Sequence, residues 1–151
     1  MKILFVCTGN TCRSCMAESI FNKRCNIEGV SAYSAGLSIV PGSIASKHSA
    51  HLVLTNLCHN ISERKAVQLT SEMIKSADLI LTMTSHMKQL LTSNLPQYNE
   101  KIYSICEFVS VEGEISDPYG GSIGVYEKTY NQLDNIVGMV LSKLKEDKGI
   151  S

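Results

Sequence analysis

The N-terminal stretch MKILFVCTGNTCRSCMAESI constrains the fold more than any other part of the chain. A continuous apolar run from Ile3 to Val6 ends at Cys7, and such a run followed by turn residues predicts a buried strand. Small and polar residues come next. From Ser14 onward apolar side chains recur at helical spacing, with Ser14 itself as the expected N-cap. The stretch therefore predicts a strand, a tight loop and a helix in direct succession.

Strand-like and helical segments continue to alternate along the chain. We expect further strands at residues 30–34, 78–83 and 101–105, and further helices at residues 43–56, 70–76, 85–92 and 122–145. The last helix has a stripe at helical spacing that consists of Tyr126, Tyr130, Leu133, Val137, Val140, Leu141 and Leu144. The alternation predicts an α/β fold whose parallel sheet is covered by helices on both faces. The length of 151 residues, without repeats or linker-like segments, fits a single domain over 1–151.

Composition narrows the class of partner. The 14 basic residues balance 14 acidic ones, so no overall charge favours nucleic acid or an anionic membrane. No apolar run approaches the ~20 residues that a membrane span requires, and we expect a cytoplasmic protein. Its six cysteines should then be mostly free thiols, and the scattered Cys25, Cys58 and Cys106 are expected to be small buried hydrophobes.

Three chemistries compete for the N-terminal cysteines Cys7, Cys12 and Cys15. Their spacing matches the first three ligands of a plant-type iron–sulfur site, but a helix begins inside the motif. Cys12 and Cys15 at a helix start also resemble a thioredoxin-type redox pair. The third interpretation is an anion cradle formed by Cys7 and Arg13 with five residues between them. We favour the cradle over both of these chemistries, and over a structural thiol with a surface arginine, because a strand precedes it and a helix follows.

A loop that leaves a strand and enters a helix can turn its backbone N–H groups toward a tetrahedral anion, and the helix N-terminus adds partial positive charge. Gly9 is expected to permit the tight backbone, and Asn10 to adopt a left-handed conformation. Arg13 can donate two parallel hydrogen bonds to phosphate oxygens. The same field favours the thiolate of Cys7 as a nucleophile for in-line attack, and the Ser14 hydroxyl can donate to its sulfur.

Such a reaction needs a proton donor for the leaving group and then a base for water. Asp117, in the Pro- and Gly-containing loop before the last helix, is the leading candidate, and Tyr119 in the same loop offers an aromatic wall. An Asp-Pro pair alone is only a turn signal, so this assignment depends on the cradle. The four histidines are expected at surface or helix positions: His48, His51, His59 and His86.

Two segments together resemble the low-molecular-weight protein phosphatases. They are Val6-Cys7-Thr8-Gly9-Asn10-Thr11-Cys12-Arg13-Ser14 and Asp117-Pro118-Tyr119-Gly120. The resemblance covers essentially the whole chain, including residues 31–36 and 77–83. It implies a three-layer domain with a four-stranded parallel sheet flanked by helices and the Cys-x5-Arg loop after the first strand. It also implies metal-free hydrolysis of phosphorylated proteins without a cofactor. We further expect a monomer.

The resemblance also implies roles for individual residues. Cys7 would be the nucleophile, Arg13 the phosphate binder, and Asp117 the general acid and then the general base. Asn10, Ser14 and Ser34 match positions that brace the loop by hydrogen bonds. The residues expected to contact phosphate or substrate are Thr8, Gly9, Asn10, Thr11, Cys12, Ser14 and Tyr119.

The middle of the loop favours one substrate class within the family. Phosphotyrosine enzymes usually carry isoleucine or leucine where this chain has Thr11, and threonine there resembles the bacterial protein-arginine phosphatases. A guanidinium is planar and polar, so a smaller side chain with a hydroxyl suits it better than a branched apolar one. Asp117 could accept from guanidinium N–H groups and protonate the leaving nitrogen. We predict a phosphoarginine phosphatase, with a phosphotyrosine phosphatase as the alternative.

The chain departs from the family pattern at two places. Cys15 replaces the usual proline after the Arg-Ser pair, which should loosen the helix start slightly. Residues 61–69 follow their family counterpart only loosely, and we expect no catalytic residue there.

An arsenate reductase and a non-catalytic binding module are less well supported. Arsenate reductases share the fold and need two further cysteines near residues 82–91, where this chain has none. A module that binds phosphorylated residues without turnover would not need Asp117.

Cys12 lies in the same loop as the nucleophile, which suggests protection against oxidation. A thiolate oxidises through a sulfenic acid that a neighbouring thiol can trap. We therefore predict a reversible Cys7–Cys12 disulfide, with Cys15 as the less favoured partner. Peroxide treatment followed by peptide mapping should recover the linked peptides. Irreversible sulfonic acid at Cys7 with no linked peptide would rule the disulfide out.

Overall fold

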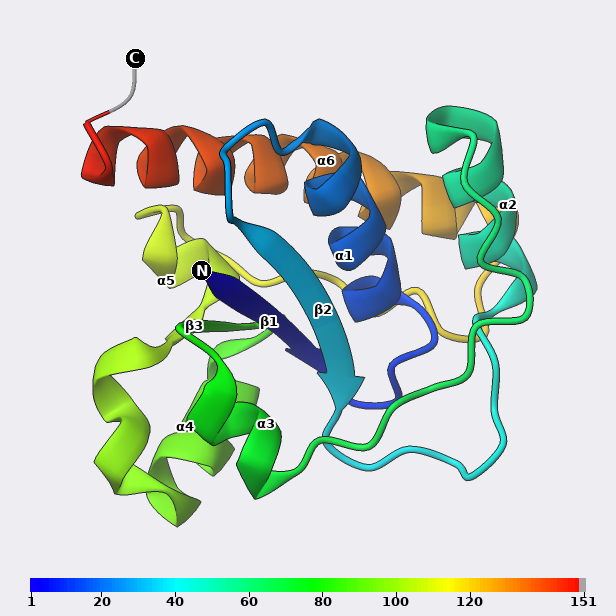
Figure 1. Ribbon diagram of the computed structural model, residues 1–151. Helices are drawn as coiled ribbons and strands as arrows, with labels where there is room; N and C mark the ends of the chain where they lie inside the picture. Colours follow the sequence, from blue (N-terminus) through cyan, green and yellow to red (C-terminus); the bar gives the residue numbers. More distant parts are fainter. Residues whose placement is uncertain (150–151) are drawn as a thin grey trace.

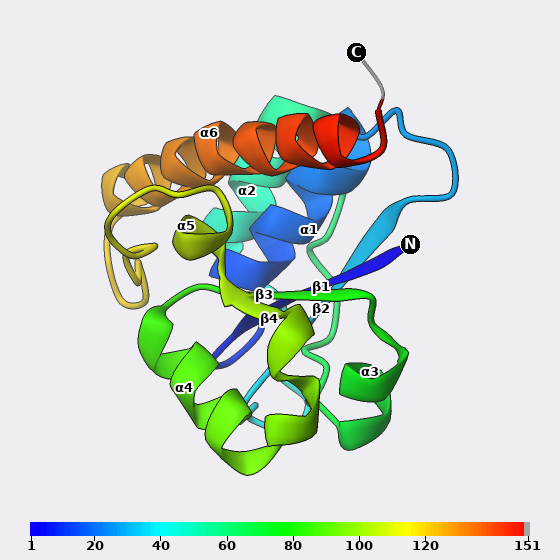
Figure 2. The same cartoon turned by 90° about the vertical axis from the view of Figure 1, so that its left-hand side faces the viewer.

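The computed structural model describes residues 1–149, which form a parallel β-sheet between two layers of helices (Figures 1 and 2). The strands are β1 (Lys2–Cys7), β2 (Ser31–Gly36), β3 (Leu79–Thr82) and β4 (Ile102–Ser104). The α-helices are α1 (Arg13–Arg24), α2 (Lys47–Leu57), α3 (Ser71–Ser76), α4 (Ser85–Asn94), α5 (Ile105–Phe108) and α6 (Ile123–Asp147), with a 3₁₀ helix η1 (Pro96–Lys101). The predicted α/β class and the four predicted strands are confirmed.

The strand order is β2-β1-β3-β4, and all neighbouring strands are parallel. The chain leaves β1 toward β2 on one side and later returns to β3 on the other side of β1. The carboxyl end of β1 is therefore the point where the connections diverge, and open α/β sheets bind their ligands in the crevice at such points. Cys7 is the last residue of β1 and pairs in register with Gly36 of β2.

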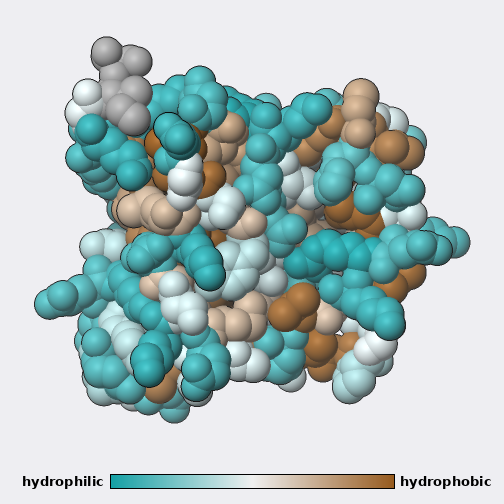
Figure 3. Space-filling model, in the orientation of Figure 1, coloured by the Kyte–Doolittle hydropathy of each residue, from teal (hydrophilic) through white to brown (hydrophobic). Residues whose placement is uncertain are grey.

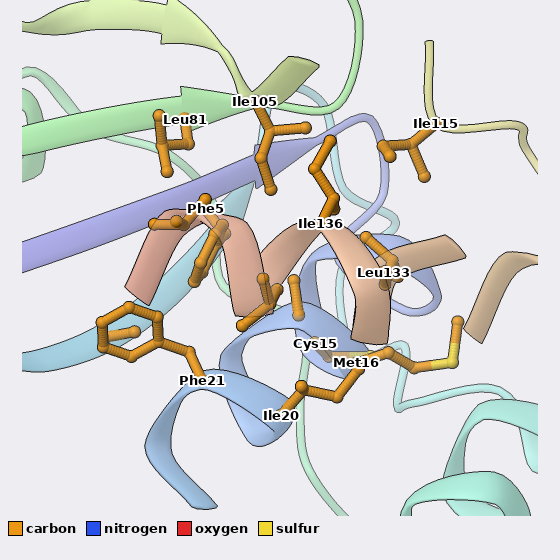
Figure 4. Close-up of a cluster of buried hydrophobic side chains, with 14 of the residues drawn as sticks. Phe5, Cys15, Met16, Ile20, Phe21, Leu81, Ile105, Ile115, Leu133 and Ile136 are labelled. Atoms are coloured by element: carbon orange, nitrogen blue, oxygen red, sulfur yellow. The ribbon is translucent and has the colours of Figure 1, made fainter. Parts of the chain in front are cut away.

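Each face of the sheet has its own hydrophobic core. Helices α1, α2, α5 and α6 cover one face, where Phe5, Phe21 and Leu133 are fully buried (Figure 4). Helices α3 and α4 cover the other face over Leu4, Val6 and Ile80 (Figure 2). The stripe predicted on the last helix is buried along its whole length, which confirms that helix and its orientation.

Three element boundaries differ from the predictions for physical reasons. The helix expected from residue 43 begins at Lys47 with Ser46 as N-cap, because residues 43–45 instead pair with residues 64–66. The first helix has Cys12 rather than Ser14 at the N-cap position, since the Ser14 hydroxyl bonds other side chains. The second strand continues through Gly36, two residues past its predicted end. The short η1 and α5 were not predicted.

Gly36 shows how tightly the sheet edge approaches the loop after β1. A Cβ atom at this position would lie 2.7 Å from the carbonyl oxygen of Thr8 and 3.0 Å from the backbone nitrogen of Asn10. Both are backbone atoms that cannot move aside without shifting the loop. Only glycine fits here, so β2 forms one wall of the loop.

Over residues 1–149, no helix combines the length and the apolar character needed to cross a bilayer.

Candidate active site

The loop between β1 and α1 turns its carbonyl groups outward. The carbonyl oxygens of Cys7 and Thr8 accept hydrogen bonds from the backbone N–H groups of Leu37 and Ser38, at 2.9 and 3.0 Å. The carbonyl oxygen of Thr11 accepts from the N–H of Ser46 at 3.0 Å. Because these carbonyls bond to the surrounding protein, the loop can present its N–H groups to its own centre. This is the geometry of an anion-binding nest.

Asn10 makes the turn that closes the loop. Its φ of 57° lies in the left-handed region, as predicted, and its backbone N–H donates to the Cys7 sulfur at 3.3 Å. The φ of Gly9 is not positive, and a Cβ there would meet only the Thr11 hydroxyl at 3.9 Å. The left-handed conformation of the loop therefore falls on Asn10, as predicted.

A chain of side-chain hydrogen bonds leads from the nucleophile candidate into the protein. The Ser14 hydroxyl lies 2.8 Å from the Cys7 sulfur and accepts from the Asn10 side-chain amide at 2.8 Å. Since the amide can only donate to this oxygen, the hydroxyl hydrogen is available to the sulfur. The same amide nitrogen donates to Ser34 at 3.0 Å. The structure thus brings together Asn10, Ser14 and Ser34, the residues predicted to brace the loop.

Two further residues in this network were not predicted. Arg64 donates to the Asn10 side-chain oxygen at 3.0 Å and to the Ser34 hydroxyl at 2.9 Å. The same guanidinium pairs with Glu18 at 3.1 Å, and Glu18 also accepts from Ser34 at 2.7 Å. The backbone N–H of Val67 gives the Asn10 oxygen its second donor, at 2.9 Å. A largely buried ion pair therefore fixes the side chains that support Cys7.

Arg64 lies in the segment where we expected no catalytic residue. It does not line the cavity above Cys7, so it acts through Asn10 as a positioning residue. The sequence carries no local signal for this role, because Arg64 contacts residues 54 and 46 positions away.

Arg13 joins the loop to the segment that carries Asp117. Its guanidinium is buried and donates to the carbonyl oxygen of Ile115 at 3.0 Å, while another nitrogen lies 3.7 Å from the Asp117 carboxylate. Ile115 is itself buried, and its N–H donates to the carbonyl oxygen of Met83 at the end of β3. The Asp117 carboxylate also accepts from the N–H of Tyr119 at 3.1 Å. These contacts place Asp117 beside Arg13 at the same cavity.

The cavity above the loop has a volume of about 550 Å³ and is lined by residues from all of these segments. Of the predicted site residues, it brings together Cys7, Thr8, Gly9, Asn10, Thr11, Cys12, Arg13, Asp117 and Tyr119. A larger hollow of about 750 Å³ lies beside α5 and α6. None of the predicted site residues lines that hollow, so the cavity above Cys7 is the candidate active site.

Tyr126 also lines this cavity and was predicted only as a core residue. Its hydroxyl lies 3.4 Å from the Cys12 sulfur. The rings of His48 and Tyr126 pack edge-on, with their centroids 5.0 Å apart. Burial, together with the hydrogen bond to Cys12, raises the pKa of Tyr126 to about 12. The phenol therefore stays protonated at neutral pH and adds a polar O–H group near the Cys12 side of the cavity.

The neighbouring cysteines occupy different environments. Cys15 is fully buried among core side chains (Figure 4), and its thiol donates to the carbonyl oxygen of Cys12 at 3.2 Å. Burial, followed by the nearby Cys7 thiol, raises the pKa of Cys15. A redox pair needs accessible, easily ionised thiols, so the geometry argues against Cys12–Cys15 pairing and against Cys15 as the partner of Cys7.

The iron–sulfur interpretation of the N-terminal cysteines also loses support. Within residues 1–149 no group of three or more His, Cys, Asp or Glu side chains is placed to hold a metal ion, which leaves such a cluster without a site.

The remaining cysteines and the histidines lie away from the cavity lining. Of the scattered cysteines, Cys106 is buried as predicted and Cys25 is half-buried. The prediction was wrong for Cys58, which is exposed because it caps α2 in a left-handed conformation. None of the four histidines lines the cavity, which leaves Asp117 as the acid candidate there.

Comparison with known proteins places this site in a family context. The profile described as low molecular weight phosphotyrosine protein phosphatase matches residues 2–149. The chain is 37% identical over 151 residues to the protein-arginine-phosphatase of Bacillus subtilis (strain 168), covering 98% of this chain and 99% of that protein. It is 41% identical over 138 residues to the low molecular weight protein-tyrosine-phosphatase PtpB of Staphylococcus haemolyticus (strain JCSC1435), covering 91% and 96%.

Among solved structures, a cysteine-to-serine variant of the YwlE arginine phosphatase with a phosphorylated active-site serine is similar over its whole length. The TM-score is 0.89 at 36% identity, and the comparison covers 100% of both chains.

The Arg64 network yields a prediction for kinetics. Arg64→Met removes both donors to Asn10 and Ser34 and leaves Glu18 without its cation, so the loop loses its support. We expect kcat for p-nitrophenyl phosphate to fall about tenfold, or ~1.4 kcal/mol, with a smaller change in KM. Steady-state kinetics, with urea unfolding to confirm that the variant is folded at the assay temperature, measures this.

Arg24→Met is the control, because Arg24 forms an ion pair of similar length with Asp134, at 3.0 Å, in a more exposed position away from the cavity. It should keep the kcat of the wild type. An equal loss of kcat in both variants would show that Arg64 matters only for general stability.

Proposed function

The chain belongs to the low molecular weight phosphotyrosine protein phosphatase family, as its resemblance suggested, and we propose that it hydrolyses phosphoarginine in proteins through a phosphocysteine intermediate. The observation that carries the mechanism is the meeting of three side chains at one cavity: Cys7 at its floor, Arg13 beside it, and Asp117 from the loop before α6. A nucleophile, a cation and a carboxyl group so arranged suit a two-step displacement.

In the first step, the phosphoryl group would occupy the nest formed by the loop. Its oxygens would accept from backbone N–H groups and from Arg13, which then exchanges its contact with Asp117 for the phosphate. The Cys7 thiolate attacks phosphorus opposite the leaving nitrogen, so an S–P bond forms as the P–N bond breaks. Asp117, protonated at this stage, gives its proton to the guanidino nitrogen.

In the second step, Asp117 is a carboxylate and accepts a proton from water. The resulting hydroxide attacks phosphorus, the S–P bond breaks, and phosphate leaves with Cys7 restored as a thiolate. The Ser14 hydroxyl, 2.8 Å from the sulfur, stabilises the negative charge that returns to it. The solved YwlE variant carries phosphate on the serine that replaces its active-site cysteine, which supports attack on phosphorus by that residue in YwlE.

Thr11 supports phosphoarginine over phosphotyrosine. The similarity to relatives does not decide between these two substrates, because an arginine phosphatase and a tyrosine phosphatase are similarly identical to this chain, at 37% and 41%. Thr11 lines the cavity, and its hydroxyl lies 3.7 Å from the Cys12 sulfur. The Tyr126 hydroxyl also lies near the Cys12 sulfur, at 3.4 Å, so this part of the cavity lining carries two hydroxyl groups. A guanidinium can hydrogen-bond to such a lining, whereas a phenyl ring cannot.

We also propose that the enzyme works in the cytoplasm, where a reducing environment keeps the Cys7 thiol available. A Cys7–Cys12 disulfide would protect that thiol under oxidation, since Cys12 lines the same cavity.

The substrate assignment predicts a measurable preference. Wild type should turn over phosphoarginine with a kcat/KM at least tenfold higher than for phosphotyrosine in matched peptides, a difference of ~1.4 kcal/mol. Thr11→Ile should lower the phosphoarginine value and raise the phosphotyrosine value, because it replaces a hydroxyl with an apolar branched chain. Phosphate release from both peptides measures this. A tenfold preference of the wild type for phosphotyrosine would assign the enzyme to the other branch.

The mechanism predicts distinct effects of two substitutions. Cys7→Ser should abolish turnover, since a serine hydroxyl is not ionised at neutral pH. Asp117→Asn keeps the shape of the side chain but cannot donate or accept the proton. It should lower kcat by roughly 10²- to 10⁴-fold, the usual contribution of general acid–base catalysis. Single-turnover kinetics on phosphoarginine measures both. Full activity of Cys7→Ser would overturn the phosphocysteine mechanism.

A further inference from the structure

Three exposed apolar side chains lie at the mouth of the active-site cavity, together with the exposed carboxyl group of Asp117. Val40 and Ile44, on the loop between β2 and α2, are 70% and 48% exposed, and Tyr119 on the opposite loop is 80% exposed. We call these three side chains the apolar rim. Figure 3 shows hydrophobic surface at the lower right, where Figure 1 draws both the loop that follows β2 and the segment that leads to α3.

The cavity lining contains two charged residues, the buried Arg13 and the exposed Asp117, and neither lysine nor histidine. The rim therefore offers a substrate no cation with which to pair an acidic neighbour. A carboxylate placed on the rim would lose part of its hydration on Val40 and Ile44 without gaining a cation in return.

Hydrogen bonds within the loop and to residues 64–66 hold the loop that carries Val40 and Ile44 in place. The Ser43 hydroxyl donates to the carbonyl oxygen of Val40 at 2.7 Å, across a turn in which Gly42 has a φ of 81°. The backbone N–H of Ala45 donates to the carbonyl oxygen of Arg64 at 2.9 Å, and the Ser43 carbonyl oxygen accepts from the N–H of residue 66 at 2.9 Å. A surface fixed in this way loses little conformational entropy when a partner binds.

We propose that the apolar rim docks the segment of the substrate protein on either side of the phosphorylated residue and selects apolar over acidic neighbours. This inference rests on the proposed function only in that a phosphorylated side chain enters the cavity. Once that side chain reaches Cys7, the backbone that carries it must cross the cavity mouth. An extended chain advances about 3.3 Å per residue, so the adjacent residues lie over the rim. Apolar neighbours bury surface there, and acidic ones do not.

Short peptides with a central phosphoarginine flanked by leucine or by glutamate test the proposal. Wild type should have a kcat/KM about fivefold higher for the leucine peptide, a modest factor because the rim remains partly open to water. The double variant Val40→Ser/Ile44→Ser should reduce the ratio between the two peptides to less than about twofold. Its kcat/KM for free phosphoarginine, which has no neighbours, should stay that of the wild type.

The double variant Leu54→Ser/Leu90→Ser is the matched control. These leucines are similarly exposed, at 51% and 42%, but neither lines the cavity, so the leucine peptide should keep its advantage. A wild type that treats both peptides equally or prefers glutamate overturns the proposal, as does an unchanged ratio in Val40→Ser/Ile44→Ser. A loss of activity on free phosphoarginine in that variant would place the two side chains in catalysis instead.

The failure of the proposed function can be recognised separately. If phosphoarginine peptides are not hydrolysed, the same flanking sequences around phosphotyrosine repeat the test with the rim unchanged. A leucine preference there, lost in Val40→Ser/Ile44→Ser, supports the rim while rejecting phosphoarginine as the substrate.

Discussion

The side-chain amide of Asn10 is the contact on which the active-site loop depends. An asparagine amide has two donor hydrogens and an oxygen that accepts two bonds, and here all of them are used in a buried position. Its donors hold Ser14 and Ser34, and its oxygen accepts from Arg64 and Val67. A buried amide with all its bonds satisfied favours a single conformation. These bonds hold Asn10 in a left-handed backbone conformation, which glycine adopts more readily than other residues.

The site is assembled from segments that the parallel sheet brings to one edge. Cys7 ends β1, Gly36 ends β2, and the carbonyl oxygen of Met83, just after β3, accepts from the N–H of Ile115. The carbonyl oxygen of Ile115 in turn accepts from Arg13, so the loop carrying Asp117 is bonded both to the sheet and to the buried guanidinium of Arg13. Since the carboxyl ends of parallel strands meet at the same edge, the fold itself supplies the convergence, and side chains add only the final positioning.

The sequence was informative where the determining contacts are local. The strand, loop and helix around Cys7 and the buried stripe of the last helix depend on neighbouring residues, and both were predicted correctly. The roles of Arg64 and Glu18 could not be predicted, since each depends on partners far along the chain. The late start of α2 has the same origin: residues 43–45 have helical spacing, but pairing with residues 64–66 overrides that local preference. Ser34 was expected only because of the family resemblance.

Under the two proposals, different parts of the cavity select the phosphorylated side chain and the residues that flank it. Cys7, Arg13 and Thr11 line the cavity, and under the proposed function they would contact the phosphorylated side chain itself and determine which residue can react. The rim residues lie at the cavity mouth, on the loop after β2 and on the loop before α6, where they would contact what flanks that residue. Energetic effects at positions without shared partners are usually additive, so substrate chemistry and sequence context can change independently. The two parts of the cavity are nevertheless linked through the backbone. The N–H groups of Ser38 and Ser46, on the loop that carries Val40 and Ile44, donate to the carbonyl oxygens of Thr8 and Thr11. Residues 43–45 of the same loop also pair with residues 64–66, the segment of the loop support Arg64.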